Sequence, residues 1–455
     1  MVTSAKLSCT ISKENFKFGS IKEVLAKANE EKSGDTLAGI SANSELERIA
    51  AKSVLSQLTL ANLRNEPVVP YEEDSVTRLI DDSVEETAWS KVKNWTVGEL
   101  REFILQSPGG EVRALSKAFT GEIAAAVTKL MSNLDLVVAA KKCPVKSTAN
   151  STLGDAGVLG ARLQPNHPAD SVEGILASIY DGLSFGIGDA VIGINPVNDT
   201  PESVEQLLHL TNEVIEKLQI PTQNCILSHV TTQMLAIKRG APAGLIFQSI
   251  AGTEKGNTAF GITIEMLEQA RELGLSKCLN KGKKPMYFET GQGSELSSRS
   301  NFDADQLTLE ARCYAFARAF DPFLVNDVCG FIGPEYLADG RQMIRAGLED
   351  HFMGKLLGVP MGIDACYTNH MQADQNDLEN LAILLTCAGV NYFMGVPMGD
   401  DVMLGYQTTS FHDVAALREL MNCRPAPEFE KWLESRELIK DGKLTDRAGD
   451  ATVFW

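Results

Sequence analysis

The sequence predicts an α/β fold: a (β/α)8 TIM barrel with a helical N-terminal region and a short C-terminal extension. The main observation is that, from about residue 156, short apolar segments alternate with amphipathic ones eight times. The ends of the apolar segments are spaced by roughly 20 to 40 residues, the length of a βα unit. A doubly wound sheet would need a Gly-x-Gly-x-x-Gly loop after its first strand, and the sequence has none.

Each apolar segment is expected to form one strand, because it is short and bounded by turn-forming residues. The helices between the strands carry their own signals. Thr200 and Pro201 fit an N-cap followed by proline at the first helical position. Gly389 fits the end of the seventh helix, and Ser410 with Asp413 begins the last one. The expected strands cover residues 157–164, 190–195, 225–229, 244–248, 285–289, 323–327, 361–364 and 391–395.

The barrel is expected to occupy residues 150–423, with further regions on both sides. Residues 1–149 are predicted to form a helical region packed on the barrel, in which Thr96 and Glu99 resemble a capping box. Residues 424–455 form the C-terminal extension, with one helix over 429–437 and a polar tail that could cover the barrel or a neighbouring subunit. The expected N-terminal helices cover residues 21–31, 45–60, 74–92, 96–106 and 115–131.

Composition excludes several classes of function. The chain has 455 residues, with 42 Lys and Arg against 60 Asp and Glu, a net charge of −18. Such a balance argues against nucleic acid as the main partner. No apolar run approaches the length of a membrane span, so no membrane insertion is expected. The nine cysteines are scattered, without a Cys-x-x-Cys pair or a signal peptide, which indicates free thiols in a reducing cytoplasm.

The candidate site lies at the carboxyl ends of the strands, where (β/α)8 barrels place their active sites. Residue 289 ends the fifth strand with a carboxylate, and the Gly291-Gln292-Gly293 loop follows it. Two or three acids, one guanidinium and three amides suit a small polar substrate with an ammonium group and an oxygen. The polar residues at these ends are Arg162, Gln164, Asn195, His229, Gln248, Glu289, Asp327 and Asp364.

These residues also have purely structural interpretations. Arg162 could serve only as the ion-pair partner of Glu289 or Asp364. Asp327 is expected to cap or pair locally, and His229 to be a satisfied core histidine. A metal site built from His229, Glu289, Asp364 and His370 is conceivable, but no local spacing supports it.

The strand ends hold a substrate but offer no evident reactive group. None of the eight ends carries the lysine that a Schiff-base aldolase would need. This gap indicates that a cofactor performs the difficult step.

Several long motifs in the same order resemble the large subunit of ethanolamine ammonia-lyase. The resemblance extends from about residue 18 to the C-terminus. The motifs cover residues 161–166, 193–197, 244–249, 287–294, 330–337 and 347–356.

The resemblance implies an adenosylcobalamin-dependent radical lyase that converts ethanolamine to acetaldehyde and ammonia, acting as the catalytic large subunit beside a small subunit. It also implies a hetero-oligomer in the cytoplasm or within a bacterial microcompartment. Substrate would be contacted by the catalytic residues Arg162, Glu289 and Asp364, and by Gln164, Asn195, Val328 and Phe331. The cofactor would be contacted by Pro196, Gln248, Ser297 and Met403, with no metal ligand from the protein.

Two other classes stay open: a metal-dependent barrel hydrolase or aldolase, and an inactive scaffold paralogue. None of the six histidines lies in an Asp-x-His-x-x-Gly loop, which many cobalamin enzymes use to replace the lower base of the cofactor. The cofactor is therefore expected to keep its dimethylbenzimidazole base. A second subunit is expected to hold the nucleotide tail.

Overall fold

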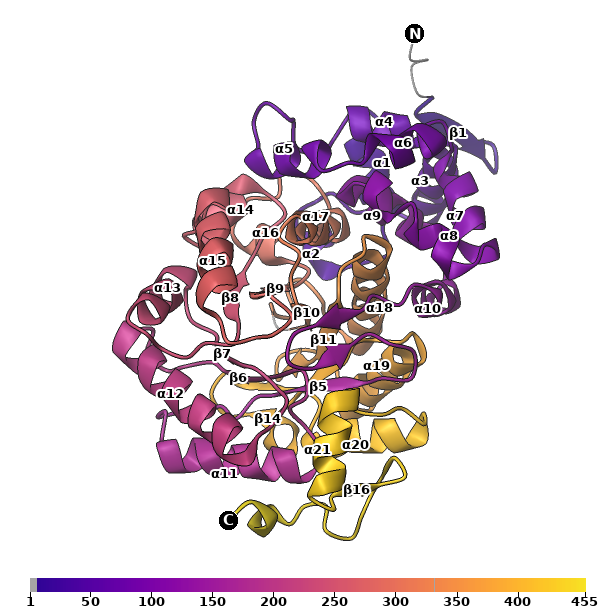
Figure 1. Ribbon diagram of the computed structural model, residues 1–455. Helices are drawn as coiled ribbons and strands as arrows, with labels where there is room; N and C mark the ends of the chain where they lie inside the picture. Colours follow the sequence, from indigo (N-terminus) through magenta and orange to yellow (C-terminus); the bar gives the residue numbers. More distant parts are fainter. Residues whose placement is uncertain (1–5, 331) are drawn as a thin grey trace.

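The computed structural model describes residues 6–330 and 332–455, and a parallel eight-stranded sheet forms its centre (Figure 1). The strand order is β7-β6-β5-β13-β11-β10-β9-β8, and every pair in it is parallel. The two ends of this order meet where Leu245 N donates to Asn224 O at 3.0 Å, so the sheet is nearly closed. The strands are β5 (Gly160–Leu163), β6 (Val191–Ile194), β7 (Asn224–Ile226), β8 (Ile246–Ser249), β9 (Met286–Thr290), β10 (Leu324–Cys329), β11 (Met361–Ala365) and β13 (Tyr392–Gly395).

A helix follows each strand, which confirms the predicted (β/α)8 barrel. The capping signals act as expected: Thr200 accepts a hydrogen bond from Ser203 N at 3.2 Å, and Pro201 opens its helix. The glycine expected at the end of the seventh helix has φ +76°, which favours glycine. The main barrel helices are α11 (Val172–Ser184), α12 (Pro201–Leu218), α13 (Val230–Lys238), α15 (Ile264–Lys277), α17 (Gln306–Arg318), α18 (Gly340–Leu356), α19 (Gln375–Cys387) and α20 (Phe411–Leu420).

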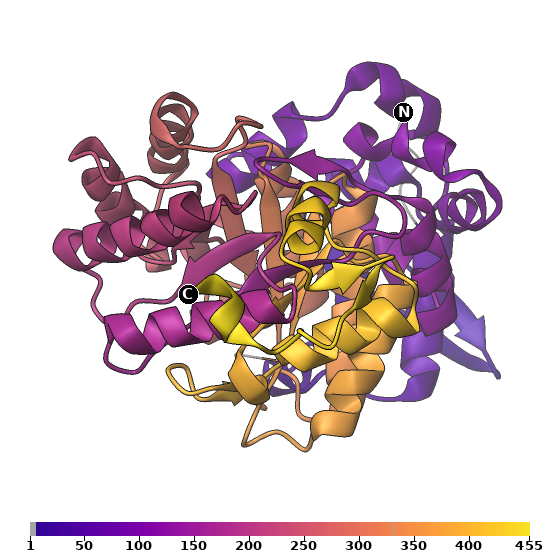
Figure 2. The same cartoon turned by 60° about the horizontal axis from the view of Figure 1, so that its bottom comes forward.

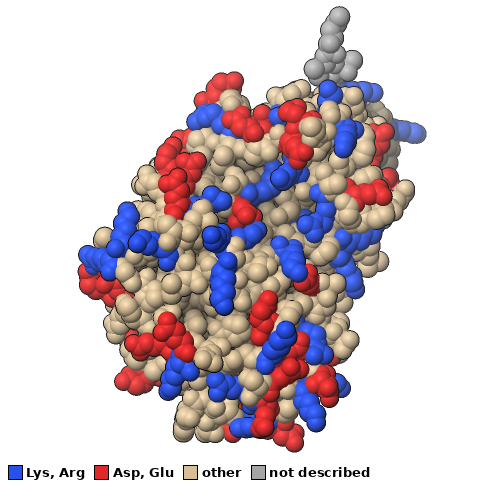
Figure 3. All heavy atoms as spheres, viewed as in Figure 1, with Lys and Arg blue, Asp and Glu red and all other residues tan. Residues whose placement is uncertain are grey.

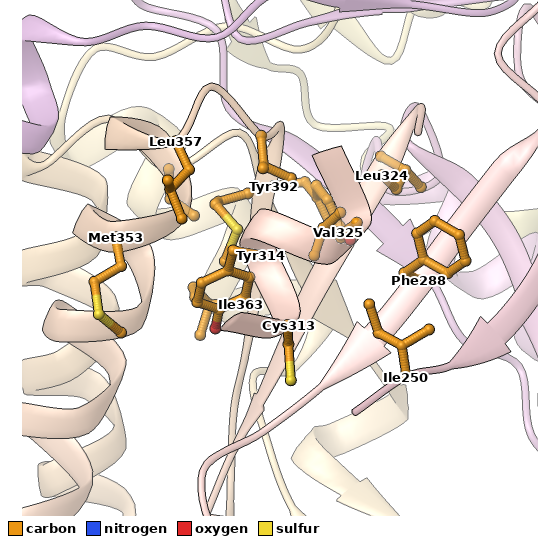
Figure 4. Packing of buried hydrophobic residues seen from close by; sticks show 14 of the residues in the cluster. Ile250, Phe288, Cys313, Tyr314, Leu324, Val325, Met353, Leu357, Ile363 and Tyr392 are labelled. Carbon is orange, nitrogen blue, oxygen red and sulfur yellow. The ribbon is translucent and has the colours of Figure 1, made fainter. Parts of the chain in front are cut away.

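The core lies between the strands and the helices that cover them. Figure 4 shows Phe288, Val325 and Ile363 of the strands near Tyr314 of α17 and Met353 of α18. All five side chains are buried. Because burying one large apolar side chain stabilises a fold by roughly 1.5–3 kcal/mol, this layer fixes the strands that carry the site.

The N-terminal region is mainly helical, as predicted, but several boundaries differ. The helix expected over 45–60 ends at Gln57, because Thr59 caps a new one. The helix expected over 74–92 is broken between Asp82 and Glu86, and the one over 115–131 is α-helical only from Gly121. The helices are α1 (Ile21–Ala28), α2 (Ser33–Leu37), α3 (Glu45–Gln57), α4 (Leu60–Asn65), α5 (Ser75–Asp82), α6 (Glu86–Val92), α7 (Val97–Gln106), α8 (Gly109–Arg113), α9 (Gly121–Lys129) and α10 (Asn133–Lys142).

An antiparallel hairpin of β1 (Ser8–Ile11) and β2 (Glu14–Lys17) precedes these helices, and the sequence analysis did not predict it. Each of its strands has four residues, so the alternation of apolar side chains is too brief to indicate a strand. Partly buried Cys9, Ile11 and Phe16 pack against the core.

Buried ion pairs join the N-terminal helices to the barrel helices. Arg312 of α17 contacts Asp74 at 3.0 Å and Glu122 of α9 at 2.6 Å. Lys129 of α9 contacts Asp305, which caps α17, at 2.8 Å. Each pair offsets the cost of burying two charges by bringing them into hydrogen-bonding contact. The division of the chain at residues 149 and 423 stays a prediction.

The C-terminal extension packs on the first barrel helix (Figure 2). It contains α21 (Pro427–Ser435), near the predicted helix, and a hairpin of β16 (Ile439–Lys440) and β17 (Lys443–Leu444). The ring of Phe454 lies 5.8 Å from that of Trp432 and 6.0 Å from that of Tyr180 on α11.

Basic and acidic side chains are interspersed on the face that Figure 3 shows. This face has no expanse of a single sign that would suit a polyanion. In the described part of the chain, no helix has both the length and the apolar character of a membrane span.

Three carboxyl groups, here called the buried acid cluster, lie between the sheet and helices α17 and α18: Glu310, Asp327 and Asp350. Asp327 pairs with Thr290 across β10 and β9, and Thr290 donates to Glu310 at 3.0 Å. Gln292 donates to Asp350 at 2.9 Å. Neither oxygen of Asp327 has a hydrogen-bond partner among the described residues, so the expectation that it caps or pairs locally is wrong.

Burial raises the pKa of all three carboxyl groups. Repulsion from Glu310 raises the pKa of Asp327 and Asp350 further, and repulsion from Glu295 raises the pKa of Glu310 to about 8. Asp327 therefore keeps its proton to a higher pH in the folded chain than an exposed aspartate does. In the unfolded chain an aspartate loses its proton near pH 4. The stability that this group contributes is thus fully present below about pH 4 and is lost as pH rises toward the folded-state pKa.

Asp327→Asn should become more stable relative to the unsubstituted chain as pH rises above about 4, because the amide never ionises. The gain is at most about 1.4 kcal/mol for each pH unit. Thermal unfolding at several pH values measures it, with the exposed Asp446→Asn as control. A difference that does not change with pH would contradict this protonation state.

Candidate active site

A cavity of about 490 Å³ opens at the carboxyl ends of the barrel strands, where the sequence places the site. This size is typical of small-molecule sites. Six of the predicted substrate residues line it: Arg162, Gln164, Asn195, Glu289, Val328 and Asp364. Two of the predicted cofactor residues, Pro196 and Gln248, line it as well.

Strand periodicity brings the first two of these residues together. Arg162 and Gln164 lie two positions apart on β5, so their side chains share one face, and Arg162 Nη2 donates to Gln164 Oε1. The register of the sheet brings together residues from neighbouring strands. Glu289 of β9 lies beside Asn326 of β10.

Glu289 forms an ion pair with Arg162 and still leaves one oxygen for a ligand. Arg162 Nη1 contacts Glu289 Oε1 at 2.5 Å, and the Tyr287 hydroxyl donates to the same oxygen at 2.5 Å. Asn326 approaches it at 3.5 Å. Glu289 Oε2 accepts no hydrogen bond from the described residues. The ion pair that the structural interpretation requires is thus present, and it is compatible with ligand binding.

Asp364 is held by two hydroxyl groups that the sequence analysis did not single out. Tyr406 donates to Asp364 Oδ2 at 2.9 Å, and Thr408 donates to Oδ1. Burial raises the pKa of Asp364 to about 7, although these hydrogen bonds and the charge of Arg162 lower it. Its carboxyl group therefore exchanges its proton near neutral pH, and a bound cation would favour the ionised form.

Arg162 is 1% exposed and carries the positive charge of the site. Burial works against that charge, but Tyr287, Glu289 and other neighbours raise the pKa of the guanidinium above its usual range. Its Nε–H is buried and donates to none of the described residues. A buried donor without a partner is uncommon and marks a place where a ligand oxygen could bind.

Tyr406 belongs to a small antiparallel sheet, and Thr408 directly follows its last strand. The sheet is formed by β12 (Tyr367–Thr368), which precedes β13, and by β14 (Asp400–Asp401) and β15 (Tyr406–Gln407), which follow it. Each of its strands has two residues, so no periodicity could predict it. The only sequence signal is the concentration of polar residues just after the eighth strand.

Three of the predicted cofactor residues have other surroundings or contacts. Gln248 satisfies local backbone groups, accepting from Val230 N at 2.9 Å and donating to Ser249 O at 3.0 Å. Ser297, at the end of α16 (Ser294–Ser297), and the half-buried Met403 do not line the cavity. Phe331 lies outside the described residues.

His229 lines the cavity and also caps α13, where its Nδ1 lies 2.7 Å from the Thr231 hydroxyl. It is half-buried rather than a core histidine. Among residues 6–330 and 332–455, no three His, Cys, Asp or Glu side chains are placed to hold a metal ion.

Comparison with known proteins gives one family. The family model "Ethanolamine ammonia lyase large subunit (EutB)" matches residues 16–447. The ethanolamine ammonia-lyase large subunit of Escherichia coli strain K12 is 57% identical over 452 residues, which cover 99% of this chain and 100% of that protein. The same subunit of Salmonella typhimurium strain LT2 is 56% identical over the same shares of both chains. The chain therefore belongs to the ethanolamine ammonia-lyase large-subunit family.

Proposed function

We propose that the cavity binds ethanolamine as its ammonium form and that this chain, as the catalytic large subunit, converts it to acetaldehyde and ammonia. The observation that carries the proposal is a buried guanidinium held beside two carboxyl groups in one small cavity. Glu289 Oε2 and Asp364 bind the ammonium group, and Arg162 donates to the hydroxyl oxygen.

Each of these groups also serves the reaction. Arg162 stabilises negative charge that develops on the oxygen as the carbonyl group forms. The carboxylates of Glu289 and Asp364 keep the nitrogen in its cationic form, which is the better leaving group. Gln164 and Asn195 fix the orientation of the bound molecule. Because Arg162, Gln164 and Glu289 are already ordered by their mutual hydrogen bonds, these three side chains need little reorganisation during turnover.

The cofactor proposed is adenosylcobalamin, and the residues present fit it. The cavity of about 490 Å³ can take ethanolamine with a nucleoside group, but not a corrin ring. The ring would lie over the mouth, where an apolar rim is exposed: Val197 is 44% exposed, Met398 82% and Val402 62%. When bound, the cofactor supplies a carbon-centred radical by homolysis of its cobalt–carbon bond.

Pro196 and Gln248 would contact the cofactor from the cavity wall, and Ser297 and Met403 from the rim. The chain's task toward the cofactor is to position it and to exclude water from the radical chemistry. A cover over the mouth is consistent with the exposed apolar rim, because such patches mark interaction sites.

We further propose that a small subunit provides this cover and holds the nucleotide tail, and that the complex acts in the cytoplasm or within a bacterial microcompartment. The test is acetaldehyde formation from ethanolamine and adenosylcobalamin, with and without the small subunit. No turnover in the complete mixture would favour an inactive paralogue. Activity that is lost with chelator and independent of cobalamin would favour a metal-dependent enzyme.

The isolated chain should bind adenosylcobalamin weakly until the small subunit is added, because its cavity has no room for the nucleotide tail. Spectroscopic titration measures the difference in affinity.

The electron-spin-resonance spectrum of the bound cofactor in its cobalt(II) form should show coupling to the benzimidazole nitrogen. His229→Ala is the matched control, since His229 lines the cavity. Tight binding by the chain alone would contradict the need for the partner, and coupling lost in His229→Ala would contradict the retained base.

A further inference from the structure

Asp401 does not line the cavity, yet its carboxylate joins two parts of the cavity wall. The side chain is buried, with 2% exposed. Its Oδ2 accepts from Gln164 Nε2 and, at 2.9 Å, from Asn166 Nδ2. Its Oδ1 accepts from the backbone N–H groups of Met403 at 3.0 Å and Leu404 at 2.7 Å. The four donors saturate the acceptor capacity of the carboxylate.

The small sheet over the barrel mouth fixes the place of this carboxylate. Asp401 of β14 pairs with Tyr406 of β15, and Gly405 N donates to Asp401 O at 2.8 Å to close the turn between them. Gly405 has φ +75°, which favours glycine. One hairpin therefore supports two substrate-facing groups: Gln164 through Asp401, and Asp364 through Tyr406.

The hydrogen bond to Asp401 helps to fix which way the amide of Gln164 faces, together with a longer bond from Nε2 to the Tyr406 hydroxyl at 3.4 Å. Because Nε2 is directed at the carboxylate, Oε1 points the other way, where Arg162 Nη2 donates to it. An amide oxygen has two acceptor sites, so one remains for a ligand in the cavity. An ammonium group has only donors, and a reversed amide would oppose it with two more.

We propose that Asp401 is a positioning residue that holds the Gln164 amide with its oxygen toward the substrate ammonium. This inference rests on the proposed function, because it requires Gln164 to contact substrate. The same carboxylate also orders Asn166, whose Oδ1 accepts from Asn195 N at 2.8 Å. A second predicted substrate residue is thus anchored through it.

Asp401→Asn keeps the shape of the side chain but presents an NH2 group to donors. In the complex with small subunit and adenosylcobalamin, KM for ethanolamine should rise on the order of 10- to 100-fold. The change in kcat should be smaller, because the ammonium contact already exists in bound substrate. Asp400→Asn is the matched control: this neighbour is exposed, and it accepts from Gln407 at 3.1 Å. A KM equal to that of the control would overturn the proposal.

A rescue experiment separates positioning from a general structural role. Gln164→Glu alone opposes two carboxylates, whereas Gln164→Glu combined with Asp401→Asn restores a donor opposite an acceptor. KM of the double variant should therefore lie close to that of the unsubstituted chain, well below KM of either single variant. Independent structural damage would instead multiply the two effects, and that result would overturn the proposal.

The same four proteins, compared by thermal unfolding, report the Gln164–Asp401 contact without any turnover. Positive coupling between the two substitutions supports the contact, and additive losses in both KM and unfolding midpoint overturn it. Failure of the unsubstituted complex to form acetaldehyde would count against the proposed function. The unfolding cycle would then still decide whether Asp401 holds the Gln164 amide.

Discussion

Glu289→Gln should fold and yet lose activity by about 100- to 1000-fold in kcat/KM. Arg162 Nη1 and the Tyr287 hydroxyl both donate to Glu289 Oε1, so the introduced amide must direct its oxygen at them. Its NH2 group then occupies the place of Oε2, where the substrate ammonium would bind. The substitution therefore replaces an ion pair with a contact between donors, although it changes neither shape nor volume.

Steady-state kinetics of the complete complex measure this effect, with thermal unfolding as the check on folding. Glu268→Gln, on the exposed face of α15, is the control and should leave activity unchanged. Near-normal kcat/KM in a folded Glu289→Gln variant would mean that Glu289 serves only the ion pair with Arg162.

Arg162→Ala should have the largest combined effect on stability and activity. It leaves Glu289 and the Tyr287 hydroxyl without their shared partner and opens a void beside Gln164. Breaking a buried ion pair costs about 3–5 kcal/mol of folding free energy. Turnover should fall further than stability alone explains, because the donor to the substrate oxygen is lost as well.

Arg162→Lys separates charge from geometry. A lysine keeps the charge but cannot donate to Glu289, Tyr287 and Gln164 through one planar group. The lysine variant should therefore retain part of kcat and more stability than Arg162→Ala. Kinetics and thermal unfolding of both variants measure the difference. Equal activities would show that charge at this position does not contribute to the reaction.

The parts of the structure that repeat could be predicted from sequence. Period-two alternation placed Arg162 and Gln164 on one face of β5, and the strand ends gave Glu289 and Asp364. The pairing of Glu289 with Arg162 could not be decided, because an ion pair and a ligand site require the same residues at those strand ends.

What the sequence could not predict depends on contacts between distant segments. Tyr406 and Thr408 support Asp364 from two-residue strands and loops that have no periodic pattern. No periodic pattern or motif indicates the role of Asp401 toward Gln164, because the two residues are 237 positions apart. The environment of Asp327 depends on Glu310 from a helix and Asp364 from another strand, so local sequence gave the wrong expectation for it.

The barrel is not closed by a continuous ladder of backbone hydrogen bonds among the described residues. Seven neighbouring strand pairs are joined by ladders, whereas β7 and β8 meet through the bond from Leu245 N to Asn224 O, without a ladder in the described chain. A side chain bridges this joint in place of a ladder: Gln233 of α13 donates to Ser228 O, just after β7, and to Phe247 O of β8 at 2.8 Å, and it accepts from Phe247 N at 2.9 Å. The part of the cavity wall that contains Gln248 therefore depends on one amide side chain at its open side, whereas Arg162, Glu289 and Asp364 lie on strands that have a ladder on both sides.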